Sequence, residues 1–157
     1  MSIALFTLAI FALTFNFFIL DAQGSLEEQI NIRSDATVNE TIKVKELKLV
    51  PTESKEYEIL FTYDITGNFK VSLDYFEKHD GGLKEYVLVN VSRDGEELYA
   101  GTLKELLDGN VLIEFEEEID NEHPVSIKIV YTMPREVGNE AQGSFATFNI
   151  KVKIEKE

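Results

Sequence analysis

The sequence of 157 residues has no cysteine, no tryptophan and only two histidines, and these absences remove whole classes of function. Without cysteine there is no disulfide scaffold, thiol nucleophile, iron–sulfur cluster or cysteine-ligated zinc. The chain is nevertheless long enough to bury a hydrophobic core that needs no covalent staples. Lack of cysteine is therefore compatible with export from the cell, where a protein with an adequate core can do without disulfides.

Basic residues are also scarce. The 15 Lys and Arg stand against 29 Asp and Glu, which gives a formal net charge of −14. Nucleic-acid binding needs clustered cations that displace counterions from phosphates, so this balance argues against a nucleic-acid partner. An anionic lipid surface would repel a protein of this negative charge, which argues against docking on such a membrane.

Motifs for catalysis and cofactor binding are missing as well. The sequence contains no H-E-x-x-H, no G-x-G-x-x-G and no G-x-S-x-G. The two histidines, His79 and His123, fall in predicted turns, where ordinary solvent exposure explains them. Acidic clusters within 94–97 and 120–122 offer hard oxygen ligands for calcium, but neither has the spacing of an EF-hand. We therefore predict a protein that is not an enzyme and that has no catalytic residue, cofactor or metal site.

A hydrophobic run opens the chain. Residues 3–20 read IALFTLAIFALTFNFFIL and carry no charge. At about 1.5 Å per residue, such a helix almost spans a bilayer core of about 30 Å. Ala22 and Gly24 follow at the spacing of a signal-peptidase site, which predicts cleavage before Ser25. A basic segment before the run is lacking, so a retained membrane anchor and a buried core helix stay open as alternatives to a cleaved signal in 1–24.

Residues 42–157 are predicted to form one β-rich domain. Apolar and polar residues alternate along several short segments, including 57–75 and 145–154, with turn residues between them. The alternation in 57–75 is interrupted at Gly67-Asn68, which predicts a hairpin, and a change of phase within 42–49 predicts a bulge. Seven or eight such strands favour an all-β fold, an antiparallel β-sandwich of the jelly-roll type.

One short helix is predicted inside this domain. Thr102 and Glu105 have the spacing of a capping box, and Gly109 is placed to end the helix. Residues 103, 106 and 107 are leucines, which would share the buried face of one or two helical turns.

The segment 127–154 contains a compact loop between two alternating strands. Pro134 removes a backbone donor and so ends the first strand, and two glycines permit turns that other residues resist. The string M-P-x-x-x-G-N-E-x-Q-G resembles that of the TasA/camelysin family of exported bacterial matrix and surface proteins. The residues that carry this resemblance are Met133, Pro134, Gly138, Asn139, Glu140, Gln142 and Gly143. A second string, residues 97–103 followed by Leu106-Leu107, is similar to the same family.

The resemblance implies assembly. Proteins of that family are jelly-roll subunits of extracellular fibres, in which the N-terminal segment of one subunit inserts as a strand into the next. Residues 25–41 lie outside the alternating pattern, directly follow the predicted cleavage site, and could extend over about 55 Å. We expect them to act as a donor strand anchored by Leu26, Ile30 and Ile32.

The expected function is therefore that of a secreted structural protein of the biofilm matrix or cell surface, whose partner is a head-to-tail polymer of itself. Two alternatives stay open for residues 25–41, a disordered leader and a strand of their own domain. A membrane-anchored surface domain is the alternative for the whole protein, with residues 3–20 as its only membrane contact. Camelysin-like members have been described as metallopeptidases, but this chain has no matching ligand set, so that activity is not carried over.

Overall fold

The computed structural model describes residues 25–32, 38–63, 67–109, 111–119, 122 and 124–157. The segment 1–24, with its predicted export signal or anchor, lies outside the described residues, as does His123. Within the described part of the chain, no helix is long and apolar enough to cross a bilayer.

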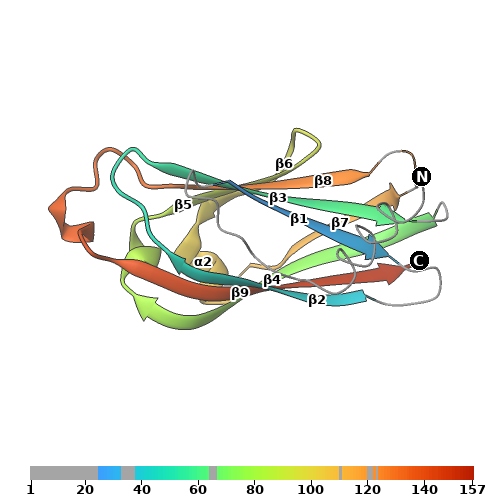
Figure 1. Cartoon of the computed structure of the whole chain (residues 1–157), viewed down its shortest axis with the longest axis horizontal. Helices are drawn as coiled ribbons and strands as arrows, with labels where there is room; N and C mark the ends of the chain where they lie inside the picture. Colours follow the sequence, from blue (N-terminus) through green and yellow to red (C-terminus); the bar gives the residue numbers. More distant parts are fainter. Residues whose placement is uncertain (1–24, 33–37, 64–66, 110, 120–121, 123) are drawn as a thin grey trace, which may run out of the picture.

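Two β-sheets pack face to face and account for most of the chain (Figure 1). Sheet A has the strand order β1 (Ser25–Ile32), β3 (Ser54–Tyr63), β8 (Val125–Thr132), β5 (Leu88–Arg93) and β6 (Glu96–Thr102). Sheet B has the order β2 (Val38–Leu47), β9 (Phe145–Lys156), β4 (Gly67–Gly81) and β7 (Ile113–Ile119). Without β1, the orders β2-β9-β4-β7 and β3-β8-β5-β6 are those of two Greek keys wound into a jelly roll. The predicted all-β sandwich is confirmed.

Strict alternation of apolar residues builds the core between the sheets. Tyr57, Ile59 and Phe61 of β3 are buried, and so are the alternate residues of β4 and β9 that face them. No charged or strongly polar residue is buried among the described residues. The side chains between the sheets that are most completely buried include Tyr131, Phe61, Phe69, Phe148, Leu47 and Leu73.

Local signals in the sequence predict several details correctly. The register between β2 and β9 shifts between Val44 and Leu47, which is the predicted bulge, and Glu46 there has φ 54°. The predicted helix is α2 (Leu103–Leu107), and both hydrogen bonds of its capping box are present. Two 3₁₀ turns, η1 (Leu83–Glu85) and η2 (Asn139–Ala141), complete the elements.

The predicted hairpin over 57–75 is wrong. β3 belongs to sheet A and pairs with β1 and β8, whereas β4 belongs to sheet B and pairs with β9 and β7. The chain therefore crosses from one sheet to the other between them. Turn residues indicate that the chain reverses, but the partner of each strand is set by the jelly-roll winding, whose contacts are remote in sequence.

The sandwich also extends N-terminally beyond the predicted boundary at residue 42. β2 begins at Val38, and residues 25–32 form β1 at the edge of sheet A. The polar composition of residues 25–32 gives little indication that they form a strand of the sandwich, because a strand at an edge needs few apolar residues.

Candidate functional site

The N-terminal strand β1 is the element for which assembly is predicted, and it lies at the edge of sheet A (Figure 1). It runs parallel to β3, in a register that places Leu26 opposite Tyr57, Ile30 opposite Phe61 and Ile32 opposite Tyr63. β3 in turn pairs with β8 on its other side, so β3 is the one described strand that is hydrogen-bonded to β1.

The predicted anchor Ile30 reaches the core. Ile30 is 4% exposed and belongs to the same buried cluster as Tyr57 and Phe61. Leu26 lies four residues before Ile30 on the same strand, and Ile32 is the last residue of β1. All three predicted anchors therefore lie on one strand, in line with the buried residues of β3.

The two edges of sheet B, β2 and β7, carry features that oppose strand addition. β2 has the bulge and positive φ described above. At β7, the Arg93 guanidinium donates to the Glu116 carbonyl at 3.2 Å and forms an ion pair with Glu117 at 2.9 Å. Arg93 also lies over the Phe115 ring at 5.5 Å. Bulges and charges at edges are the means by which natural sheets avoid unwanted pairing.

The loop 133–144, which carries the M-P-x-x-x-G-N-E-x-Q-G string, is a tight corner between β8 and β9. Met133 is fully buried, and its backbone exchanges hydrogen bonds with Glu53 and Thr52 at 3.1 and 2.9 Å. Asn139, Glu140 and Ala141 form η2, of which Ala141 is buried. The remaining residues of the string, Pro134, Gly138, Gln142 and Gly143, shape the turns on either side of η2.

The corner loop 133–144 and the start of β1 both lie near the start of β3. Ser54, at the start of β3, shares a hydroxyl hydrogen bond of 2.8 Å with Thr132, the residue before Met133. β1 begins two residues further along, where Ser25 lies opposite Glu56. The start of β1 and the corner loop therefore lie toward the same end of the sandwich.

The second string of the family resemblance has a physical explanation. The Tyr99 hydroxyl donates to the Thr102 carbonyl at 3.1 Å and to the Glu105 carboxylate at 3.0 Å. A Cβ added to Gly101 would collide with the Tyr99 hydroxyl and the Glu105 carboxylate, so a larger residue there would displace both side chains. Hydrogen bonds from the Thr102 N–H and the Tyr99 hydroxyl hold the pKa of Glu105 below its usual value.

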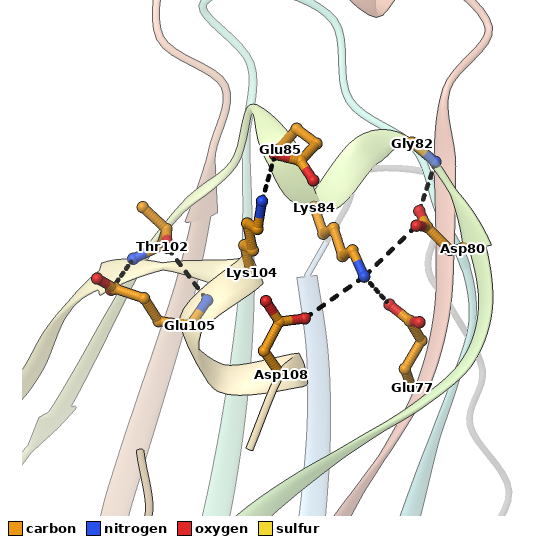
Figure 2. Close-up of polar contacts among 9 residues, drawn as sticks. All are labelled: Glu77, Asp80, Gly82, Lys84, Glu85, Thr102, Lys104, Glu105 and Asp108. Atoms are coloured by element: carbon orange, nitrogen blue, oxygen red, sulfur yellow. Dashed lines mark hydrogen bonds and ion pairs between the residues drawn. The ribbon is translucent and has the colours of Figure 1, made fainter. Parts of the chain in front are cut away.

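Three carboxylates surround the ammonium group of Lys84 (Figure 2). Lys84 Nζ lies 2.7 Å from Glu77, 3.4 Å from Asp80 and 3.5 Å from Asp108, and its side chain is only 12% exposed. The hydrogen bond to Glu77 is the main cause that raises the pKa of Lys84. The cluster ties β4, η1 and the end of α2 together, which indicates a structural role. Sequence patterns do not reveal it, because its members come from three separate elements.

Three tyrosines meet in the core near the end of β8. The hydroxyls of Tyr75 and Tyr131 share a hydrogen bond of 3.0 Å, and Tyr57 packs edge-on against Tyr131 with ring centroids 5.2 Å apart. Burial raises the pKa of all three phenols, that of Tyr57 to about 12. At neutral pH they are therefore uncharged members of the core.

The carboxylates of the acidic cluster within 94–97 each have a separate partner. Asp94 accepts a hydrogen bond from the Ser126 N–H at 3.2 Å, Glu96 pairs with Arg93, and Glu97 accepts from Asn90 at 2.8 Å. Among the described residues, no group of three or more His, Asp or Glu side chains could hold a metal ion. Residues 120 and 121 of the second cluster lie outside the described residues.

These features define the class of the protein as a jelly-roll β-sandwich with an additional parallel strand at one edge. No protein-family model matches the chain, and no curated protein matches it.

Solved structures of similar fold come from proteins with different roles. PliG of Aeromonas hydrophila, a periplasmic inhibitor of g-type lysozyme, aligns over 82% of this chain and 99% of its own, with 11% identity and a TM-score of 0.38. The mosquito-larvicidal Cry4Aa toxin of Bacillus thuringiensis aligns over 81% of this chain but 24% of its own, with 9% identity and a TM-score of 0.39. The pre-peptidase C-terminal domain of a Bacillus anthracis collagenase aligns over 80% and 95%, with 12% identity and a TM-score of 0.32. At such identities and TM-scores the likeness carries no conclusion about this chain.

Proposed function

We propose that this protein is an exported structural subunit that assembles into extracellular fibres of the biofilm matrix or cell surface. In this proposal the subunits join head to tail, and the N-terminal strand of one copy takes the place of β1 in the next. The protein acts through assembly and needs no catalytic residue.

The observation that carries this proposal is the position of β1. It is the outermost strand of sheet A, it is hydrogen-bonded to β3 and to no other described strand, and it inserts Ile30 into the core. Parallel pairing is slightly weaker per residue than antiparallel pairing, so β1 is more easily released than the other strands. A strand supplied by a second copy would form the same backbone ladder and bury the same side chain, so that exchange costs little at equilibrium.

Two further features support the same function. The bulge at β2 and the Arg93 contacts at β7 oppose strand addition at both edges of sheet B, which supports a strand being accepted on sheet A beside β3. Repetition of such a head-to-tail contact does not close on itself and gives a filament. The resemblance of the 133–143 string to the TasA/camelysin family agrees with this function and with export.

Cysteine cross-linking tests the exchange directly, because the natural chain has no cysteine. Gln29 of β1 lies opposite Leu60 of β3, and neighbouring strands are about 4.8 Å apart, which suits a disulfide. The single variants Gln29→Cys and Leu60→Cys are mixed under assembly conditions and then oxidised. We expect disulfide-linked dimers between the two variants, because β1 of one copy lies on β3 of the other.

The matched control replaces Leu60→Cys by Lys128→Cys, an exposed position on β8 that is not a neighbour of β1. A second variant lacks residues 25–33, and we expect it to remain a folded monomer that forms no fibres in negative stain. Fibres from this truncated chain, or dimers that form equally well with the control, would show that β1 is not exchanged.

A membrane-anchored surface domain is the second candidate, and the uncharged run of residues 3–20 favours it. The N-terminus of the protein isolated from its host separates the two. Ser25 as first residue supports export with cleavage, whereas a chain that retains residues 3–20 supports the anchor.

A further inference from the structure

The outer face of sheet B carries a group of lysines along one edge. Lys43 and Lys45 of β2, with Lys151 and Lys153 of the neighbouring β9, are all exposed. The β2–β9 register places these residues on adjacent positions of one face, since Lys151 lies opposite Thr41. Four of the 15 basic residues of a strongly acidic chain are thus gathered on two strands, and we call them the basic strip.

The opposite edge of the same face is acidic. β7 exposes Glu114, Glu116 and Glu118, which alternate with residues that face the core, and we call them the acidic strip. β2 and β7 are the two outermost strands of sheet B, with β9 and β4 between them. One sheet face therefore has opposite charges at its two edges.

Part of this charge has no ion-pair partner among the described residues, and Lys151 lies over the Phe76 ring at 3.9 Å. Glu114 pairs with Lys70 at 3.3 Å, and Lys153 pairs with Glu155 at 2.6 Å. Among the described residues, no ion pair is formed by the side chains at the centre of each edge, which are Lys43, Lys45, Glu116 and Glu118. Three strand spacings of about 4.8 Å separate β2 from β7, or about 14 Å in total, which exceeds the screening length of about 8 Å at physiological salt. Within one molecule the basic and acidic strips therefore attract each other weakly, and the residue opposite Glu116 is Lys70 of β4. Two molecules can instead bring the strips into direct contact.

We propose that copies of this protein associate side by side, with the basic strip of one copy against the acidic strip of the next. The strand directions are compatible with this contact. Sheet B is antiparallel throughout, so β2 and β7 run in opposite directions, and β2 of one copy placed beside β7 of another continues the alternation. Arg93 already occupies the Glu116 carbonyl, so the contact is formed by side chains and not by a backbone ladder.

This contact is separate from the exchange of β1, which takes place at the edge of sheet A. It is heterologous and does not close, so it would join fibres laterally or cluster single subunits. Its ion pairs are exposed, so it is weak and depends on ionic strength.

The test uses charge reversal in the purified chain, with self-association measured by sedimentation velocity at about 0.1 M salt. The variants Lys43→Glu/Lys45→Glu and Glu116→Lys/Glu118→Lys are each expected to associate at least about tenfold more weakly than the natural chain. The chain that combines all four substitutions has restored complementarity and the natural net charge, and we expect its association to recover. An equimolar mixture of the two double variants should recover as well. The natural chain should become dissociated at about 1 M salt, where the screening length is about 3 Å.

The matched control is Lys104→Glu/Lys128→Glu, which changes the net charge as much as the first variant but lies on α2 and β8. It should associate more strongly than Lys43→Glu/Lys45→Glu. Equal loss in both, or no recovery in the fourfold variant, would overturn the proposal. The same series in a chain with Gln29→Cys/Leu60→Cys oxidised within each copy removes strand exchange. Association that persists there supports the lateral contact whether or not β1 is exchanged in fibres, and loss of association there overturns it.

Discussion

At the scale of single residues, the hydroxyls of Tyr75 and Tyr131 are polar atoms that the core itself has to satisfy. They come from opposite sheets and meet at 3.0 Å, and each ring is surrounded by apolar side chains such as Phe148. A buried hydroxyl that loses its partner bears the full cost of desolvation, whereas removal of both hydroxyls leaves an ordinary aromatic core.

The variants Tyr75→Phe and Tyr131→Phe are each expected to lower the free energy of unfolding by about 1–3 kcal/mol. The double variant should cost less than the sum of the two, because neither hydroxyl is then left alone. Urea unfolding followed by circular dichroism measures the three values. Additive losses would mean that the two hydroxyls do not depend on each other.

The corner loop offers a second prediction at this scale. Gly143 has φ 76°, a left-handed conformation that costs other residues about 1–2 kcal/mol, so Gly143→Ala should reduce stability by about that amount. Gly138 serves as the control, because its φ is negative and an added Cβ would meet only the mobile end of the Glu140 side chain. Midpoints of urea unfolding compare the two, and equal losses would contradict the assignment of strain to Gly143.

At the scale of elements, local chemistry could be predicted from the sequence, whereas strand partners could not. The capping box at Thr102 and the bulge after Val44 each depend on a few neighbouring residues. The supposed pairing of β3 with β4 failed because pairing in a jelly roll joins segments that are far apart in the sequence. For β1 the sequence leaves a donor strand, a leader and a strand of the same domain open, because its polar residues give only a weak alternation.

The capping box is the element-scale feature that can be tested most simply. The Glu105 N–H donates to the Thr102 hydroxyl at 3.2 Å, and the Thr102 N–H donates to the Glu105 carboxylate at 3.1 Å. Thr102→Ala should lower the free energy of unfolding by about 1 kcal/mol, while Thr102→Ser, which keeps the hydroxyl, should stay close to the natural chain. If alanine and serine behave alike in thermal unfolding, the cap does not contribute to stability.

Part of the candidate site could likewise be predicted from the sequence, and part depends on contacts between strands. The sequence identifies residues 25–41 as unusual and Ile30 as an apolar anchor, and Ile30 is buried in the structure. The Arg93 contacts at β7 and the position of the β2 bulge at an edge of sheet B depend on contacts between strands, which the sequence pattern does not reveal. The charge strips of sheet B become visible only when β2 and β7 are placed at opposite edges.

At the scale of the whole molecule, the net charge of −14 opposes any assembly. Residues 1–24 contain one acid and no base, so the predicted exported part keeps all 15 Lys and Arg and 28 of the 29 Asp and Glu, a net charge of −13. Subunits that are joined end to end bring these charges together. The lateral contact instead depends on local attraction between unlike charges.

Salt should therefore affect the two contacts differently. Between about 0.01 and 0.1 M salt the screening length falls from about 30 to 10 Å. This change weakens the repulsion between whole subunits but leaves the attraction between neighbouring side chains of opposite charge largely intact. Fibre growth should therefore accelerate over this range. Between about 0.1 and 1 M the length falls to about 3 Å, and lateral bundles should separate while the fibres, held by a backbone ladder and buried side chains, persist. Light scattering follows growth, and negative stain distinguishes single fibres from bundles. Fibres that dissolve together with the bundles at high salt would mean that ion pairs, and not an exchanged strand, hold the subunits end to end.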